Sequence, residues 1–225
     1  MDILFDTANL DDIERLTPIY PVTGVTTNPS ILKKEGRVDV YKHLRRIREI
    51  IGPDRTLHVQ VLQKTAQGMI DDAHRLLDKI DEKVYPKIPT TEAGILAMRT
   101  LKAEGVHVTA TAIYSKTQGF LAIASGVDYL APYYNRMQSL DIDTKGTLTA
   151  LSGFIRRFDA PCKIMAASFK NIVQVSHALE AGADAVTLSP KLLRQALSVP
   201  DITNAVDTFI SDWESVYGTR SLPDD

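Results

Sequence analysis

The stretch VYPKIPTTEAG (residues 84–94) joins a short apolar run to the beginning of a segment with helical spacing. Residues 84–88 are predicted to form a buried strand, because the run is short and apolar. Residues 95–103, which follow, carry apolar side chains at the spacing of an amphipathic helix. A strand followed by a helix is therefore the unit that this stretch predicts, and the rest of the chain repeats it.

Eight short apolar runs are candidate strands, at residues 3–5, 24–26, 57–61, 84–88, 106–111, 129–131, 163–167 and 185–188. Between them lie segments with helical spacing, at residues 38–51, 66–80, 95–103, 118–125, 171–181 and 191–197. Strands that alternate with helices indicate a parallel sheet, and eight such units in about 190 residues predict a closed (β/α)8 TIM barrel. The main alternative, an open doubly wound sheet, would need a glycine-rich loop after the first strand, where the chain has DTAN (residues 6–9).

The length of the chain is usual for one α/β barrel. Its 225 residues, of which 44% are hydrophobic and 24% charged, have the composition of an ordinary globular protein. We expect one domain over residues 1–225. It should include an extra helix or two within residues 133–158, a C-terminal helix at about residues 202–217 and a short polar tail, residues 218–225.

Charge and cysteine content argue against several classes of protein. A net charge of −2 gives no basic surface for nucleic acid or an anionic membrane. The chain has no run of about 18 apolar residues and no signal-peptide pattern, so no membrane span is predicted. The single cysteine, Cys162, allows no internal disulfide, and the five histidines have no metal-ligand spacing. We therefore expect a cytoplasmic protein without a metal or other cofactor.

The polarity of a barrel indicates which of its ionisable residues are candidates for catalysis and which contribute to stability. In (β/α)8 barrels catalytic groups lie at the carboxyl ends of the strands, whereas residues at the other end contribute to stability. Asp2, Lys83 and Lys163 stand at predicted strand starts, and Asp6 and Lys87 stand at predicted strand ends. Asp6 and Lys87 are therefore the first candidates for catalysis.

Lys87 lies between Pro86 and Pro89 at the end of an apolar run. The alternative is a loop lysine that reaches water, but the two prolines fix the backbone on both sides. A buried lysine loses proton affinity, so that its neutral amine becomes available near neutral pH. Because a neutral amine can add to a ketone and form a Schiff base without a metal, the position predicts covalent catalysis by Lys87.

Polar residues at the ends of the first two strands are candidates for substrate contact. Asp6 could be a turn residue, but Asn9 is the better cap for the helix that follows, which leaves Asp6 free for another role. Thr26 and Asn28 close the second strand. Asn28 before Pro29 is typical of a helix N-cap, and a hydroxyl and an amide at this place could also bind sugar hydroxyls.

Three further polar residues lie in or directly after strands three, five and six. Gln60 stands in the middle of the predicted strand at residues 57–61. Gln60 must find a hydrogen-bond partner, and it faces the barrel interior if Val59 and Val61 face the helices. Thr111 is predicted to end strand five, where β-propensity alone would also explain it. Tyr133 follows strand six, either as a core aromatic residue or as part of a site.

The loops after strands six and seven carry a candidate phosphate site. Ser168 and Lys170 follow strand seven, where barrel enzymes often bind phosphate, and they precede a predicted helix N-terminus. Arg136 follows strand six and could lie beside them or on the surface. A hydroxyl, cationic side chains and a helix N-terminus together predict the binding of a phosphorylated small molecule.

Taken together, these motifs resemble the transaldolase family, and most closely its short-chain branch, which includes the fructose-6-phosphate aldolases. The resemblance covers essentially the whole chain and rests on Asp6 and on GVTTNPS (24–30), KIPTTEAG (87–94), APYYNR (131–136) and AASFK (166–170). It implies a class I mechanism on a (β/α)8 barrel, with sugar phosphates as substrates and no cofactor. On the same resemblance, Lys87 matches the Schiff-base lysine, and Asp6 matches the carboxylate that assists proton transfer and orients hydroxyls.

The resemblance also implies roles for the other candidates. Thr26 and Asn28 match contacts to substrate hydroxyls, and Arg136 and Ser168 match phosphate binders. Gln60 and Thr111 match the residues that hold a proton-shuttling water. The family further implies a homodecamer built from rings, in which the C-terminal helix packs onto a neighbouring subunit. The apolar stripe of residues 202–217 fits that packing, but it could equally cover its own barrel.

Two positions distinguish aldolases from transaldolases within this resemblance. Transaldolases carry glutamate at the position of Gln60 and usually phenylalanine at that of Tyr133, whereas the aldolases carry the residues found here. A glutamine can orient water but cannot titrate, so the phenol of Tyr133 would have to supply the proton. Lys170 replaces an arginine of other transaldolases, which gives up a bidentate phosphate contact.

We therefore predict a fructose-6-phosphate aldolase that interconverts this sugar with dihydroxyacetone and glyceraldehyde 3-phosphate. The closest alternative is a transaldolase of the pentose phosphate pathway, which transfers the dihydroxyacetone unit to a second sugar phosphate. An isomerase or epimerase would need a further carboxylate or a metal at the carboxyl ends of the strands. A non-catalytic sugar-phosphate-binding barrel would keep Arg136 and Ser168 but would not depend on Lys87.

Overall fold

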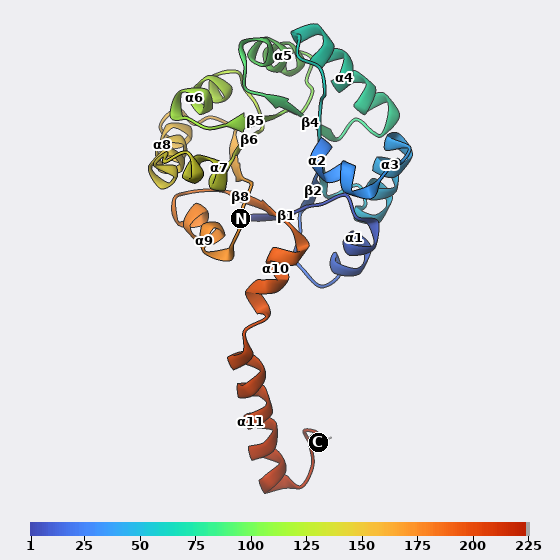
Figure 1. The fold of residues 1–225 in the computed structure, drawn as a ribbon, viewed down its shortest axis with the longest axis vertical. Coiled ribbons are helices and arrows are strands. Elements are labelled where there is room, and N and C mark those ends of the chain that lie inside the picture. Colours follow the sequence, from blue (N-terminus) through green and yellow to red (C-terminus); the bar gives the residue numbers. More distant parts are fainter. Residues whose placement is uncertain (224–225) are drawn as a thin grey trace.

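The computed structural model describes residues 1–223, in which eight parallel strands close into a barrel. The strands follow one another round the barrel in chain order, and β8 pairs with β1 to close it (Figure 1). Their bounds are β1 Asp2–Asp6, β2 Gly24–Thr26, β3 Thr56–Gln60, β4 Val84–Pro89, β5 Thr109–Ile113, β6 Tyr129–Pro132, β7 Lys163–Ala166 and β8 Ala185–Leu188. The predicted (β/α)8 TIM barrel is confirmed, and the open sheet is wrong.

Helices surround the ring of strands (Figure 1). Side-chain caps set most of their starts; Asn9, for example, accepts a hydrogen bond from the backbone N–H of Asp12 at the start of α1. Two helices, α7 and α8, lie between β6 and β7, as predicted. The bounds are α1 Leu10–Leu16, α2 Pro29–Leu32, the 3-10 helix η1 Lys33–Glu35, α3 Val40–Ile51, α4 Ala66–Lys79, α5 Glu92–Ala103, α6 Lys116–Ala124, α7 Tyr134–Ser139, α8 Thr144–Arg157, α9 Ile172–Glu180, α10 Pro190–Leu197 and α11 Pro200–Tyr217.

The fifth strand differs from its prediction. β5 begins at Thr109 rather than at residue 106, because the backbone N–H of Val108 donates to the Asp128 carboxylate at 2.7 Å and not to a neighbouring strand. The strand then continues past an irregular register that includes Ala112, whose φ is 57°. Thr111 therefore lies inside β5 and not at its end.

Apolar side chains form two separate cores. The larger one lies between the strands and the helices and includes Val25 and Ile88. The smaller one fills the inside of the barrel with Leu4, Tyr129, Ala131, Met165 and Ala185. Successive residues of a strand point to opposite faces, so the outward position of Ile88 turns its neighbour Lys87 toward the barrel interior.

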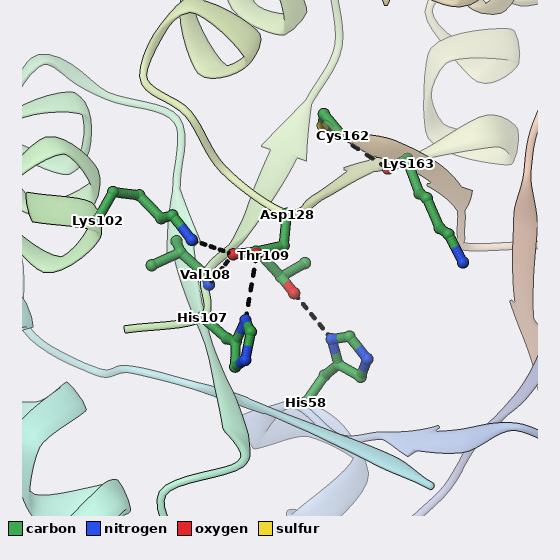
Figure 2. Close-up of polar contacts among 8 residues, drawn as sticks. All are labelled: His58, Lys102, His107, Val108, Thr109, Asp128, Cys162 and Lys163. Atoms are coloured by element: carbon green, nitrogen blue, oxygen red, sulfur yellow. Dashed lines mark hydrogen bonds and ion pairs between the residues drawn. The ribbon is translucent and has the colours of Figure 1, made fainter. Parts of the chain in front are cut away.

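Ion pairs and hydrogen bonds fix the end of the barrel at which the strands start. Figure 2 shows the carboxylate of Asp128 contacted by Lys102 Nζ at 2.7 Å and by His107 Nδ1 at 3.2 Å. At the same end, Lys163 Nζ lies 2.9 Å from the carboxylate of Asp2. Asp2 and Lys163 thus pair with each other, far from the carboxyl ends of the strands, as the barrel polarity predicted.

The helix α11 extends away from the barrel (Figure 1). None of its residues is buried, and its apolar side chains include Phe209, which is 69% exposed. The predicted C-terminal helix is confirmed, whereas the alternative in which it covers its own barrel is wrong. No helix among residues 1–223 is long and apolar enough to cross a membrane. The predicted polar tail, residues 218–225, ends in two residues outside the described range.

Candidate active site

A polar cavity of ≈ 270 Å³ opens at the carboxyl ends of the strands. It brings together residues that were predicted from the sequence as site candidates, and they come from most sides of the barrel. They are Asp6, Asn28, Gln60, Lys87, Tyr133, Arg136 and Ser168. Pro29, Ser30, Ala167 and Thr187 complete the lining. Since these residues come from segments far apart in the sequence, barrel closure is what assembles the site.

Lys87 enters this cavity from the inner face of β4 and is only 5% exposed. Its Nζ donates a hydrogen bond to the backbone carbonyl oxygen of Thr27 at 3.0 Å. Burial lowers the pKa of Lys87 below its usual value, and the negative charge of Asp6 opposes this shift only in part. The position therefore favours the neutral amine that Schiff-base formation requires.

Asp6 reaches the cavity from the end of β1. A chain of two threonine hydroxyls holds its carboxylate, since one hydroxyl contacts Asp6 and the second contacts the first. Thr26 Oγ1 donates to Asp6 Oδ1 at 2.7 Å and lies 2.6 Å from Thr187 Oγ1. Because Thr26 has a single hydroxyl proton, Thr187 must donate to Thr26. Burial raises the pKa of Asp6, although the charge of Lys87 and the hydrogen bond from Thr26 act against it. A carboxyl group with a raised pKa is suited to proton exchange with a substrate near neutral pH.

Thr26 and Thr187 differ from what the sequence suggested. Thr26 is fully buried behind Asp6 and is not among the lining residues, so its geometry supports positioning of the carboxylate rather than contact with substrate hydroxyls. Thr187 was not predicted, although a threonine one residue before the end of an apolar strand was a signal that could have found it.

Gln60, from the neighbouring strand β3, and Tyr133, which follows β6, line the cavity together with Lys87. Gln60 is the last residue of β3, rather than lying in its middle, and pairs in register with Lys87. Tyr133 OH lies 3.0 Å from Thr111 Oγ1, which connects the buried Thr111 to the cavity. An amide and two hydroxyls are thereby presented near the amine, which is a set that can hold and orient a water molecule.

Arg136 forms the cationic side of the cavity. Its NH1 donates to the phenol oxygen of Tyr114 at 3.2 Å, and its guanidinium carbon lies 4.5 Å from the ring centroid of Tyr133. The hydrogen bond that Arg136 donates to Tyr114 is the main cause that raises the pKa of Arg136. Tyr114 was missed in the sequence, because its link to Arg136 depends on how the loops after β5 and β6 meet.

Of the two candidates after β7, Ser168 lines the cavity and Lys170 does not. Ser168 lines the cavity with a left-handed backbone, at a φ of 65°. Lys170 is exposed and is not among the residues that line the cavity; its backbone N–H donates to Gln174 Oε1 at 2.8 Å. The predicted phosphate role of Ser168 thus fits the geometry, whereas that of Lys170 finds no support in it.

Asn28 caps α2, as predicted, and also lines the cavity. Its Oδ1 accepts from the backbone N–H of Ile31 at 3.0 Å and so caps α2, with Pro29 in the first turn. The cap uses only the oxygen of the amide, so the nitrogen stays available to the cavity that Asn28 lines.

The side chain of His58 occupies the barrel interior on the strand that ends in Gln60. Its two ring nitrogens lie 2.8 Å from Thr109 Oγ1 and 2.9 Å from Thr56 Oγ1 (Figure 2 shows the first contact). Burial lowers the pKa of His58 well below its usual value, and the charge of Lys87 lowers it further. His58 is therefore a neutral, doubly hydrogen-bonded residue and not a second base.

A second pocket of ≈ 420 Å³ shares Asn28, Pro29 and Gln60 with the polar cavity. Its other walls are mainly apolar, as with Leu32 and Leu76, and neither Lys87 nor Arg136 lines it. Although this pocket is larger, the groups able to carry out chemistry converge on the smaller cavity.

Comparison with known proteins shows the family of the chain. The family model described as Transaldolase/Fructose-6-phosphate aldolase matches residues 3–219. The chain is also 45% identical, over 222 residues, to a protein of Streptococcus pneumoniae (strain ATCC 700669 / Spain 23F-1) named "Probable fructose-6-phosphate aldolase". That alignment covers 99% of this chain and 100% of the relative. The chain therefore belongs to the transaldolase/fructose-6-phosphate aldolase family.

Proposed function

We propose that this protein is a class I aldolase that cleaves or forms fructose 6-phosphate. The products of cleavage are dihydroxyacetone and glyceraldehyde 3-phosphate. The observation that carries the proposal is a buried lysine, Lys87, whose pKa is lowered and which shares a polar cavity with Asp6 and Arg136. The name of the Streptococcus pneumoniae relative supports the same activity.

The first steps form the Schiff base. The neutral amine of Lys87 adds to the C2 carbonyl of the ketose, and the carbinolamine loses water to give an iminium ion. Asp6, whose pKa is raised by burial, donates the proton that lets this water leave and can later take it back. Asn28 would contact the substrate hydroxyls, while Thr26 orients Asp6.

The second stage breaks the carbon–carbon bond. A water held by Gln60, Thr111 and Tyr133 removes the proton from the C4 hydroxyl. The electrons of the C3–C4 bond then move toward the iminium, which leaves an enamine on Lys87 and releases glyceraldehyde 3-phosphate. Protonation of the enamine at C3, for which Tyr133 is the proposed acid, regenerates the iminium. Its hydrolysis releases dihydroxyacetone and the free amine.

The phosphate of the substrate would bind on the side of the cavity that holds Arg136 and Ser168. The Arg136 guanidinium is fixed by Tyr114 and by the ring of Tyr133, so little side-chain entropy is lost when it binds an anion. Lys170 would contribute at most through its charge, because it does not line the cavity.

Transaldolase activity is the second candidate, and Gln60 argues against it. A glutamine cannot titrate. Tyr133, which is hydrogen-bonded to Thr111 at 3.0 Å, can protonate the enamine, so that dihydroxyacetone is released without an acceptor sugar. Kinetics with fructose 6-phosphate alone separate the two activities. Sustained turnover without an acceptor sugar supports the aldolase, and a single turnover that resumes on addition of an acceptor supports the transaldolase.

Borohydride trapping tests the proposal directly. The protein is incubated with dihydroxyacetone or fructose 6-phosphate, reduced, digested and analysed by mass spectrometry, with Lys87→Met as the control. We expect a three-carbon adduct on Lys87 alone. An adduct on Lys83 or Lys163, or no adduct, would overturn the mechanism. A Lys87→Ala variant that binds sugar phosphate as well as an inactive wild type would instead support a non-catalytic binding protein.

We also propose a cytoplasmic homo-oligomer, a decamer if it follows the family resemblance. The exposed apolar stripe of α11 supports assembly, because Val206, Phe209 and Ile210 would be covered by another copy. Light scattering on the full chain and on a chain that ends before α11 tests this proposal. A monomeric full chain at micromolar concentration would contradict it.

A further inference from the structure

Lys34 is a cation near the candidate active site to which the proposed mechanism assigns no role. It lies in η1, which continues directly from α2, and α2 supplies Pro29 and Ser30 to the lining of the cavity. The side chain is exposed, and within residues 1–223 it takes part in no ion pair. Its charge is therefore not neutralised by a neighbour in the described part of the chain.

The segment that carries Lys34 lies beside the cavity, because it continues from the lining residues Pro29 and Ser30. Lys34 follows Ser30 by four residues, so it lies a little more than one turn further along the continuous α2–η1 segment. Side chains on a helix lean toward its N-terminus, which carries Lys34 back over the turn that contains Ser30. In Figure 1, α2 lies on the side of α3 that faces the centre of the ring of strands.

A hydrogen bond between loops holds this segment in place. Asn9 Nδ2 donates to Glu35 Oε2 at 3.3 Å, while the oxygen of the same amide caps α1. Asn9 stands three residues after Asp6, so the bond fastens η1 to the loop that leaves the end of β1. Lys34 is thus presented by an anchored turn rather than by a free loop.

Lys34 does not line the cavity itself, but its segment and that of Arg136 leave the barrel on opposite sides. The segment of Lys34 follows β2 and that of Arg136 follows β6, and these strands stand four places apart in a ring of eight. Burial raises the pKa of Asp6, and the positive charges of Lys87, Lys34 and Arg136 act against this shift. A phosphorylated substrate would pass between the two cations as it enters.

We propose that Lys34 is a second recognition group for phosphorylated substrates, which attracts the phosphate dianion to the cavity mouth and thereby selects sugar phosphates over neutral sugars. The inference rests on the proposed aldolase function and refines its substrate specificity. A charge that acts at the entrance raises the rate of productive capture, so its contribution belongs in kcat/KM and weakens with salt.

The test compares Lys34→Met with Lys33→Met, which removes the same charge from the exposed neighbouring residue. Aldol addition is measured with dihydroxyacetone as donor and either glyceraldehyde 3-phosphate or D-glyceraldehyde as acceptor. At about 0.01 M ionic strength, the ratio of the two kcat/KM values should fall about threefold or more in Lys34→Met, and it should stay at the wild-type value in Lys33→Met. At about 1 M salt, where the Debye length is about 3 Å, the ratios of the two variants should converge.

A Lys34→Met ratio equal to that of the wild type, or an equal loss with Lys33→Met, would overturn the inference. A wild-type protein that makes no product with either acceptor would refute the aldolase function instead. In that case, calorimetric binding of fructose 6-phosphate decides on Lys34. Weaker binding by Lys34→Met alone would support its role, and equal dissociation constants would exclude it.

Discussion

Replacing Tyr133 by phenylalanine would remove the phenol hydroxyl and leave the ring in place. The hydroxyl lies 3.0 Å from Thr111 Oγ1, and the Arg136 guanidinium carbon lies 4.5 Å from the ring centroid. A phenylalanine ring keeps this cation–π contact, so the phosphate side of the cavity should persist. The free energy of unfolding should fall by about 1 kcal/mol, the worth of one hydrogen bond, which is about 2–4 °C in Tm for a chain of this size.

The effect on activity should be far larger than the effect on stability. If Tyr133 moves the proton of the C4 hydroxyl and protonates the enamine, its loss should lower kcat about 10²- to 10⁴-fold. The assay is steady-state cleavage of fructose 6-phosphate, with release of glyceraldehyde 3-phosphate coupled to its oxidation. KM should change little, because the substrate contacts remain. Addition of an acceptor sugar should restore part of the turnover, since transfer does not require protonation of the enamine.

Tyr114→Phe is the matched control for this variant. Tyr114 carries a phenol in the same loop region, hydrogen-bonded to Arg136 NH1 at 3.2 Å, and its ring packs against that of Tyr133 at 5.6 Å. This variant should raise KM, because Arg136 loses a hydrogen-bond partner on the phosphate side of the cavity. Its kcat should stay within about threefold of the wild type. A kcat of Tyr133→Phe within about threefold of the wild type, or an equal loss of kcat in both variants, would refute the assignment of Tyr133 as the acid.

Three further outcomes are expected. Lys87→Met should raise Tm at neutral pH by removing a buried cation. Since the pKa of Lys87 is lowered in the folded state, the gain in Tm should shrink as pH rises toward 10.5, the usual pKa of lysine, and a lower Tm for the variant would contradict this. Gly94→Ala should cost about 3 kcal/mol or more in urea unfolding, because the new Cβ would overlap the carbonyl oxygen of Pro89. Gly153→Ala in α8, where nothing lies within 4 Å of the new Cβ, should instead gain about 0.5–1 kcal/mol, and equal effects would refute the steric argument. Burial raises the pKa of Cys162 to about 12, so mass spectrometry should detect maleimide labelling at pH 8 only after unfolding, and rapid labelling of the folded chain would oppose this reasoning.

Local sequence patterns were sufficient for the fold and for the central residue of the site. The alternation of apolar runs with amphipathic segments predicted the parallel barrel, because side-chain periodicity reports directly on strand and helix. The same pattern placed Lys87 near the carboxyl end of a strand, and in the structure it lies two residues before the end of β4. Barrel polarity then predicted that it lies on the functional side. The caps at Asn9 and Asn28 were also readable, since a cap depends on residues three positions apart.

Contacts between distant segments were decided by the tertiary structure alone. The sequence of β5 did not indicate that the Asp128 carboxylate accepts a hydrogen bond from the backbone N–H of Val108. Because of this bond, the strand begins only at Thr109. Thr26 and Thr187 stand 161 positions apart, yet closure of β8 against β1 and β1 against β2 brings their hydroxyls to 2.6 Å and makes Thr26 a support for Asp6.

The sequence by itself thus determined the barrel and the residues at its carboxyl ends. The tertiary structure decided which of those residues face the cavity, since Ser168 lines it and Lys170, two positions later, does not. It also decided the protonation of the site. The lowered pKa of Lys87 and the raised pKa of Asp6 both arise mainly from burial, which exists only when the strands close around them.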